Sequence, residues 1–177
     1  EEVSAEKVVV AAGSRPLVPP IDGLDEVDYM TSADALYLRD RPDSLVILGG
    51  GYIAVELGYF FESMGTEVRI VEMMDSLVPR EDGAVSETFT EIAESRHDVY
   101  TGHRVTEVEP DDGDVVVHAE TEDGDSISVG GEEVLVALGR RPNTDTLDVE
   151  AAGIELDDRG FVETDEYLAA SEENVWA

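Results

Sequence analysis

The stretch that decides the fold is Ser44-Leu45-Val46-Ile47-Leu48-Gly49-Gly50-Gly51-Tyr52-Ile53-Ala54-Val55-Glu56. Its apolar first part predicts a buried strand that ends in glycines, and the residues that follow predict a helix to about residue 64. After a turn, a second apolar run over residues 68–71 is closed by Glu72. The order of strand, glycine-rich turn, helix and strand is typical of a βαβ unit in a parallel sheet.

The glycine-rich turn has the chemistry of a dinucleotide site. In the pattern Gly-x-Gly-x-x-Ala, Gly49 permits the tight turn, Gly51 lets the backbone approach a pyrophosphate, and Ala54 lets the helix pack close to the strand. The helix N-terminus presents free N–H groups and a partial positive charge to an anion. A βα turn without a ligand shows the same glycines, and the flanking strand, helix and acid favour the dinucleotide interpretation.

Glu72 is the residue that predicts which dinucleotide binds. It follows Gly51 by 21 residues and closes the second strand, where a carboxylate accepts hydrogen bonds from the adenosine ribose. Its negative charge would repel a 2′-phosphate, so NAD is favoured over NADP. Arg80 is the nearest basic residue after it, since Met73 and Met74 follow Glu72 directly. Arg80 would still be able to reach a 2′-phosphate, and Glu72 argues against that role.

The remaining patterns complete an α/β prediction. We expect a buried strand over residues 7–12, a helix over 83–96 whose apolar face carries Val85, Phe89, Ile92 and Ala93, and a third parallel strand over 98–101. Alternating segments at 104–109, 115–120 and 126–129 predict an antiparallel meander, and residues 133–138 predict a further buried parallel strand. The predicted fold is a Rossmann-like βαβ parallel sheet with a three-stranded antiparallel meander.

Charge is the second informative property of the chain. Its 177 residues carry 43 acidic and 11 basic side chains, a net charge of −32, and one lysine among the cations. Such a charge repels itself at low ionic strength, whereas molar salt shortens the Debye length to about 3 Å. We therefore expect a protein of a halophile's cytoplasm. An acidic tail or nucleic-acid mimic is the alternative, and the even spread of the acids argues against it. An acidic interaction protein is a further alternative, which would bind no nucleotide. The charge disfavours nucleic-acid binding.

Several site classes are not predicted. The chain has no cysteine, which excludes disulfides and thiolate chemistry within it. No apolar run reaches the length of a membrane span, and residues 1–4 do not read as a signal peptide. The acidic stretches 111–114 and 122–125 are expected to be hairpin turns rather than calcium loops. His97, His103 and His118 are expected to be exposed, so we predict no catalytic residue and no metal ligand here.

The glycine unit, Glu72, the meander and the run Ala137-Leu138-Gly139-Arg140-Arg141-Pro142-Asn143-Thr144 stand in an order that resembles one enzyme family. The chain is similar to the NAD(P)-binding domain of the FAD-dependent pyridine nucleotide-disulfide oxidoreductases. The resemblance implies a remnant of the FAD-binding domain at residues 1–13, the NAD-binding domain at 14–144, and a return into the FAD-binding domain at 145–177. Residues 1–13 and 145–177 are then expected to be partly mobile, or to pair with a neighbouring chain through an exposed edge or apolar surface.

The resemblance also implies which residues bind cofactors. They are Gly49, Gly50, Gly51, Tyr52, Ile53, Ala54, Glu56, Glu72, Val105, Gly139, Arg140, Ala12, Gly13 and Ser14. Tyr52 matches an aromatic residue that lies over the flavin, and Glu56 matches a carboxylate that holds the nicotinamide carboxamide. Without a cofactor role, Tyr52 would be a partly buried aromatic residue at the helix start and Glu56 a solvated glutamate of the helix. Val105 matches an adenine-side position or belongs to the meander core. Residues 139–140 match a loop that faces nicotinamide and flavin, and residues 12–14 match a segment that lines the FAD.

The implied function is that of an NAD(H)-binding domain in a flavoprotein disulfide oxidoreductase, most closely dihydrolipoamide dehydrogenase. In the intact enzyme NAD exchanges hydride with FAD, and a redox-active cysteine pair outside these residues acts on a dithiol or disulfide substrate. The implied whole enzyme is a homodimer, free of nucleic acid and membrane. This fragment alone should bind NAD(H) and catalyse nothing. Mercuric, mycothione or glutathione-type reductases are alternatives of the same class, and a stand-alone NAD-sensing module is an alternative of another class.

Overall fold

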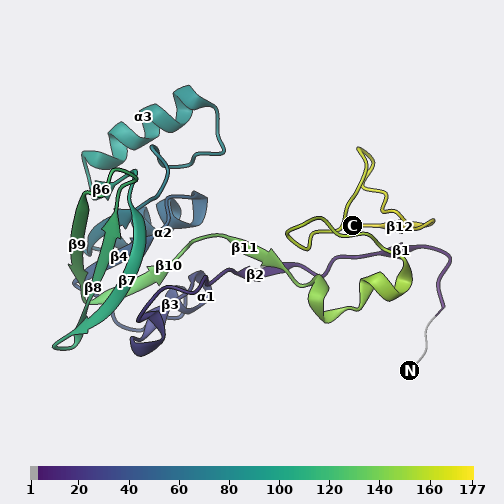
Figure 1. The fold of residues 1–177 in the computed structure, drawn as a ribbon, viewed down its shortest axis with the longest axis horizontal. Helices are drawn as coiled ribbons and strands as arrows, with labels where there is room; N and C mark the ends of the chain where they lie inside the picture. The colour runs from purple at the N-terminus through teal and green to yellow at the C-terminus, as the bar shows by residue number, and fades with distance from the viewer. Residues whose placement is uncertain (1–3) are drawn as a thin grey trace. The chain divides into compact units, whose positions relative to one another are not determined.

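The computed structural model describes residues 4–177, which form two compact units. The central unit is Pro16–Gly139, and the flanking unit comprises residues 4–15 and 140–177. Ser4, where the described residues begin, and Ala177 both belong to the flanking unit (Figure 1). In residues 4–177 no helix is long and apolar enough to cross a membrane. The boundaries predicted after residues 13 and 144 separate the NAD-binding domain from segments of an FAD-binding domain. These domain assignments stay predictions.

The central unit is built on a parallel sheet of five strands in the order β3-β10-β4-β5-β6. Their bounds are Tyr29–Met30 for β3, Glu133–Val136 for β10, Ser44–Leu48 for β4, Glu67–Val71 for β5 and Asp98–Tyr100 for β6. The helices are α1, Ser32–Ala35, α2, Tyr52–Ser63, and α3, Gly83–Glu94, with the 3-10 helix η1 at Leu24–Glu26. The predicted βαβ unit is confirmed as β4-α2-β5, which are consecutive and pair in parallel.

An antiparallel meander covers one face of this sheet (Figure 1). Its strands are β7, Arg104–Asp111, β8, Asp114–Glu120, and β9, Ser126–Gly131. Alternate residues of β4 divide between the two faces, because successive side chains of a strand point in opposite directions. Val46 and Leu48 pack with the meander, whereas Leu45 and Ile47 pack with the helices. Each of these four side chains is 0 % exposed, and burying one contributes about 1.5–3 kcal/mol. The predicted fold class is thus confirmed.

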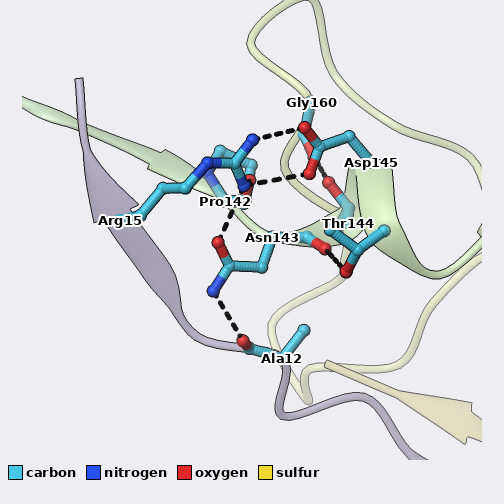
Figure 2. Close-up of polar contacts among 8 residues, drawn as sticks. Ala12, Arg15, Pro142, Asn143, Thr144, Asp145 and Gly160 are labelled. Atoms are coloured by element: carbon cyan, nitrogen blue, oxygen red, sulfur yellow. Dashed lines mark hydrogen bonds and ion pairs between the residues drawn. The ribbon is translucent and has the colours of Figure 1, made fainter. Parts of the chain in front are cut away.

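The flanking unit has little regular structure. It holds two-stranded sheets formed by β1, Val8–Val9, with β12, Val175–Trp176, and by β2, Ser14–Pro16, with β11, Arg140–Pro142. Two 3-10 helices follow β11, η2 at Thr144–Thr146 and η3 at Val149–Ala152. A polar network joins β2 to η2 (Figure 2). Arg15 pairs with Asp145, and its Nη1 donates to Asn143 Oδ1 at 2.8 Å. Asn143 Nδ2 in turn donates to the carbonyl of Ala12 at 3.0 Å.

Three expectations from the sequence are wrong in detail. The strand predicted over residues 7–12 is shorter and not buried, because β1 pairs only with β12 and Val9 is 71 % exposed. The predicted apolar face of α3 is rotated: Val85 and Ile92 are exposed, and Ser86, Thr90 and Ala93 are buried. All three histidines are half-buried rather than exposed. His103 contacts the carbonyl of Thr101, and His118 lies between Ser128 and Glu109.

His97 provides a pH-dependent stability prediction. Its Nδ1 is buried without a hydrogen-bond partner, and burial lowers the pKa of the imidazole, with Glu62 opposing and Arg96 adding to the shift. The unfolded chain therefore binds this proton more readily than the folded chain. Above pH 6.5 the ring is neutral in both the folded and the unfolded chain, so protonation of His97 costs the folded state nothing. As the pH falls from 6.5 through the lowered pKa of the folded state, the unfolded chain takes up the proton first and the free energy of unfolding decreases.

We expect His97→Gln to flatten the fall in the free energy of unfolding between pH 7 and pH 5. Urea denaturation at fixed salt across this range measures the effect. Profiles of the parent and the variant that run parallel throughout would contradict the role of His97.

Candidate functional site

The candidate site lies where the sheet changes its strand order. From β4 the chain proceeds outward through β5 and β6, whereas β10 adds to the opposite side of β4. The carboxyl ends of β4 and β10 therefore flank the point at which open α/β sheets bind ligands. Gly49 and Ala137 are the residues that follow these two strands, and the amide of Ala137 donates to the carbonyl of Leu48 at 2.9 Å.

Gly49 and Gly50 are required by the fold itself. Gly49 has φ +105°, and a Cβ built on it would lie 2.7 Å from the carbonyl oxygen of Ala137. A Cβ on Gly50 would lie 2.6 Å from Leu77 Cδ2 and 2.9 Å from Glu72 Cγ. Contacts this short exclude a side chain at either position. These two glycines are therefore explained without a ligand.

Gly51 has no such internal reason to be glycine. Its φ is −75°, an ordinary value, and a Cβ built on it would meet nothing within 4 Å. Gly51 is the N-cap of α2 and offers no side chain to the first-turn amides. The amides of residues 51–54 have no partner inside the helix, because the first four N–H groups of any helix lack one. The loop thus presents free donors beside open space, which is the arrangement that an anion needs.

The first turns of α2 separate buried residues from exposed ones. Ala54 is 0 % exposed and allows the close packing of helix and sheet, as the sequence predicts. Ile53 is half-buried. Tyr52 is 59 % exposed and Glu56 is exposed as well, so both lie on a common open face of the helix. The alternative that Tyr52 is a partly buried aromatic is not what the structure shows.

Glu72 is buried beside the glycine loop, with 7 % of its surface exposed. Its carboxylate accepts a hydrogen bond from the amide of Gly50 and another, at 2.8 Å, from the amide of Met74. The backbone of Glu72 also bonds to its neighbours, donating to the carbonyl of Tyr100 and accepting from the amide of His103, each at 2.9 Å. A carboxylate has about four acceptor positions, so two remain for a ligand.

The remaining predicted residues divide between the two units. Val105 is half-buried and packs against the core cluster under the meander, and Gly139 is exposed with φ +123°. Ala12, Gly13, Ser14 and Arg140 belong to the flanking unit. There Arg140 Nε donates to Ser14 Oγ at 2.8 Å, and Arg140 also bonds to the Ser14 carbonyl. Within the central unit, the structure therefore brings together Gly49, Gly50, Gly51 and Glu72.

A family comparison decides the assignment of this fold. The family model described as "Pyridine nucleotide-disulphide oxidoreductase" matches residues 1–177. The chain belongs to that family. Members of this pyridine nucleotide-disulphide oxidoreductase family are enzymes that use FAD and NAD(P).

Individual relatives agree with the family. The chain is 36% identical over 178 residues to a mercuric reductase of Staphylococcus aureus, covering 100% of this chain and 32% of that protein. It is 37% identical over 179 residues to a dihydrolipoyl dehydrogenase of Haloferax volcanii, covering 100% of this chain and 38% of that protein. The solved HOCl-induced flavoprotein disulfide reductase RclA of Escherichia coli superposes with a TM-score of 0.84 at 31% identity, covering 98% of this chain and 39% of RclA. The chain thus spans roughly a third of the length of these relatives.

The sequence did not indicate one part of the site. Leu77 and Val78 contact Gly50, and Ser86 and Thr90 of α3 hold these two residues through hydrogen bonds. The sequence holds only a weak indication of this support: Ser86 and Thr90 lie four residues apart, and so on one face of α3, which turns toward the core. Among residues 4–177, no group of three or more histidine, aspartate or glutamate side chains is arranged to hold a metal ion.

Proposed function

We propose that the central unit binds NAD(H) for a flavin-dependent disulfide oxidoreductase of which this chain forms part. Gly51 carries the proposal, because among the three glycines of the turn it is the one that the fold itself does not explain, and it stands at the N-terminus of α2. The amides of residues 51–53 would hold the pyrophosphate, and Glu72 would accept from the ribose. When bound, the nicotinamide supplies hydride chemistry, and the chain supplies binding and orientation.

The exposed face of α2 supports a redox role rather than sensing alone. Tyr52 and Glu56 lie on one open helix face next to the glycine loop. We propose that Glu56 holds the nicotinamide carboxamide and that Tyr52 covers the flavin until nicotinamide displaces it. Val105 would contact the adenine side. A module that only senses NAD needs neither Tyr52 nor Glu56, so their placement favours the oxidoreductase.

The contacts to FAD are proposed from the family. Residues 12–14, Gly139 and Arg140 match segments that line the flavin or face it. Arg140 and Ser14 already bond to each other within the flanking unit, so they would present a preformed edge to the cofactor. In the intact homodimer we propose, electrons pass from FAD to a cysteine pair outside this chain and on to a disulfide or dithiol substrate.

For the substrate we propose dihydrolipoamide. Dihydrolipoyl dehydrogenases of Haloferax volcanii and Halobacterium salinarum match the whole chain at 37% and 36% identity. The acidic composition fits a relative of such enzymes in a cell with concentrated salt. Mercuric reductase, at 36% identity to the Staphylococcus aureus protein, and mycothione reductase, at 36% to the Mycobacterium tuberculosis protein, are the alternatives.

Calorimetric titration with NADH and NADPH in about 2 M KCl, where charge screening is nearly complete, tests the cofactor assignment. We expect NADH to bind at least about tenfold more tightly than NADPH, which corresponds to about 1.4 kcal/mol. Glu72→Gln should shrink this ratio, because it removes the charge that repels the 2′-phosphate and keeps the side-chain shape. The measurement is the ratio of the two dissociation constants in the parent and the variant.

Glu120→Gln is the matched control, since Glu120 is exposed at the end of β8 and the substitution changes the net charge equally. It should leave the ratio unchanged. Glu72→Ala is a poorer probe, because it would leave both the Gly50 and the Met74 amide without an acceptor, at about 1–3 kcal/mol each, whereas Gln keeps an acceptor oxygen for one of them. An unchanged ratio in Glu72→Gln would remove Glu72 from the specificity site. No binding of either nucleotide by the folded parent protein would refute the proposed function.

A further inference from the structure

Helix α3 carries two buried hydroxyl groups that face a single stretch of backbone. Ser86 is 4% exposed and Thr90 is 8% exposed. The hydroxyl of Thr90 accepts from the amide of Leu77 at 2.9 Å and donates to the carbonyl of Ser86 at 2.7 Å. The hydroxyl of Ser86 donates to the carbonyl of Val78 at 2.8 Å. Both side chains thus bind the backbone of residues 77–78.

Those two residues in turn support the glycine loop. The amide of Val78 donates to the carbonyl of Gly50 at 2.7 Å. The side chain of Leu77 is 0% exposed and fills the space directly against the Gly50 Cα. The Gly50 amide is held separately by Glu72. Gly50 is therefore fixed at both its N–H and its carbonyl, and the carbonyl contact comes from the segment that α3 holds.

Val78 has an unfavourable backbone conformation, which its hydrogen-bond partners hold in place. Val78 has φ +45°, in the left-handed region that β-branched residues avoid. Its carbonyl accepts from the Ser86 hydroxyl at 2.8 Å and from the Glu81 amide at 3.0 Å, and its amide bonds to Gly50. A residue keeps such a conformation only where its surroundings determine it on several sides. Losing the α3 hydroxyls would let residues 77–78 relax toward an ordinary conformation.

We propose that Thr90 and Ser86 are positioning residues for the dinucleotide site, acting on the glycine loop through Leu77 and Val78 without touching the ligand. The proposal rests on the proposed function, NAD(H) binding. When residues 77–78 relax, Gly50 loses its carbonyl partner and the packing beside it. The amides of residues 51–53 then converge less well on a pyrophosphate, and affinity falls although every group that contacts the nucleotide is still present.

The experiment compares three isosteric or conservative variants of this chain by NADH titration in about 2 M KCl. Thr90→Val keeps the shape and removes the hydroxyl. We expect the dissociation constant to rise about tenfold, by analogy with the lower end of the losses measured when outer-shell support of a metal site is removed. Thr90→Ser keeps the hydroxyl and should restore affinity to within about twofold of the parent. Urea denaturation of each variant measures its stability beside its affinity.

Thr66→Val is the matched control. Thr66 is 3% exposed in the same unit, and its hydroxyl donates to the Pro42 carbonyl at 2.8 Å. Thr66 directly precedes β5, whereas Glu72 follows the opposite end of that strand. We expect it to lose stability as Thr90→Val does and to keep the parent's NADH affinity. This separation of stability from affinity is what a merely structural role for Thr90 would not produce.

Each outcome has a distinct meaning. Equal NADH affinities of Thr90→Val and Thr66→Val, with the parent binding NADH, would overturn the positioning role and leave the proposed function intact. Failure of the folded parent to bind NADH would overturn both. If Thr90→Val does not fold by circular dichroism, Ser86→Ala replaces it, since it breaks the bond to Val78 alone and should raise the dissociation constant in the same direction.

Discussion

Gly51→Ala is expected to weaken NADH binding about 100-fold, or about 2.7 kcal/mol, while the chain keeps its fold. The new methyl group would enter open space, since a Cβ at Gly51 meets nothing within 4 Å. That space is where the backbone must approach a pyrophosphate if the proposed function is correct. The cost to folding should be small, about 1 kcal/mol, because alanine is a poorer helix N-cap than glycine. Calorimetric titration and urea denaturation measure the two effects separately.

Gly83→Ala is the control for this experiment. Gly83 is the first residue of α3, and a Cβ built on it also meets nothing within 4 Å. Alanine there should leave NADH affinity unchanged and change stability by less than about 1 kcal/mol. Gly49 and Gly50 would be unsuitable targets, because added side chains there clash with the protein itself. Unchanged NADH affinity in Gly51→Ala would show that the pyrophosphate does not lie at this turn.

The parts of the site that the sequence predicted are local in the chain. The apolar run of β4, the glycines after it and the acid that closes β5 lie within a single βαβ unit. Their spacing fixes their geometry, because a strand, a tight turn and a helix leave few ways to place Gly49, Gly51 and Glu72. The same argument explains why Ala54 could be assigned to the buried side of α2 from its position alone.

The parts that the sequence missed depend on backbone conformation. Ser86 and Thr90 are buried because their hydroxyls satisfy the backbone of residues 77–78, and nothing in the periodicity of α3 indicates that partner. The helical spacing of apolar residues predicted that Val85 and Ile92 would be buried, but both are exposed in the structure. The exposure of Val9 was missed for a related reason. A short apolar run looks the same in a central strand and in a two-stranded sheet.

The network around Arg15 shows the same limit at longer range. Arg15 and Asp145 are separated by 130 positions, yet they form an ion pair beside the hydrogen bond to Asn143 (Figure 2). The guanidinium of Arg15 holds the pKa of the Asp145 carboxyl below its usual value, mainly through their hydrogen bond. The family resemblance assigned residues 12–14 and 140 to a cofactor, whereas the pairing of β2 with β11 gives these segments a structural connection as well.

The acidic surface leads to the prediction with the broadest effect. The net charge is −32, whereas the arginine ion pairs of residues 4–177 engage only five carboxylates, those of Asp145, Asp43, Glu67, Asp98 and Glu62. Most acids are therefore left to repel one another across the surface. At 0.1 M salt the Debye length is about 10 Å, and at 1 M it is about 3 Å. Molar salt should thus remove most of this repulsion.

We expect the melting temperature to rise by more than about 10 °C between 0.1 and 2 M KCl, given that about 1 kcal/mol shifts it by 2–4 °C in a chain of this size. Thermal unfolding followed by circular dichroism measures this.

Replacing Glu122, Asp123 and Asp125 together by Gln, Asn and Asn removes three charges from an exposed turn between β8 and β9. This triple variant should melt higher than the parent at 0.1 M KCl and converge with it at 2 M, because screening then hides the removed charges. A melting temperature that is flat with salt in the parent would contradict self-repulsion as the reason for this composition.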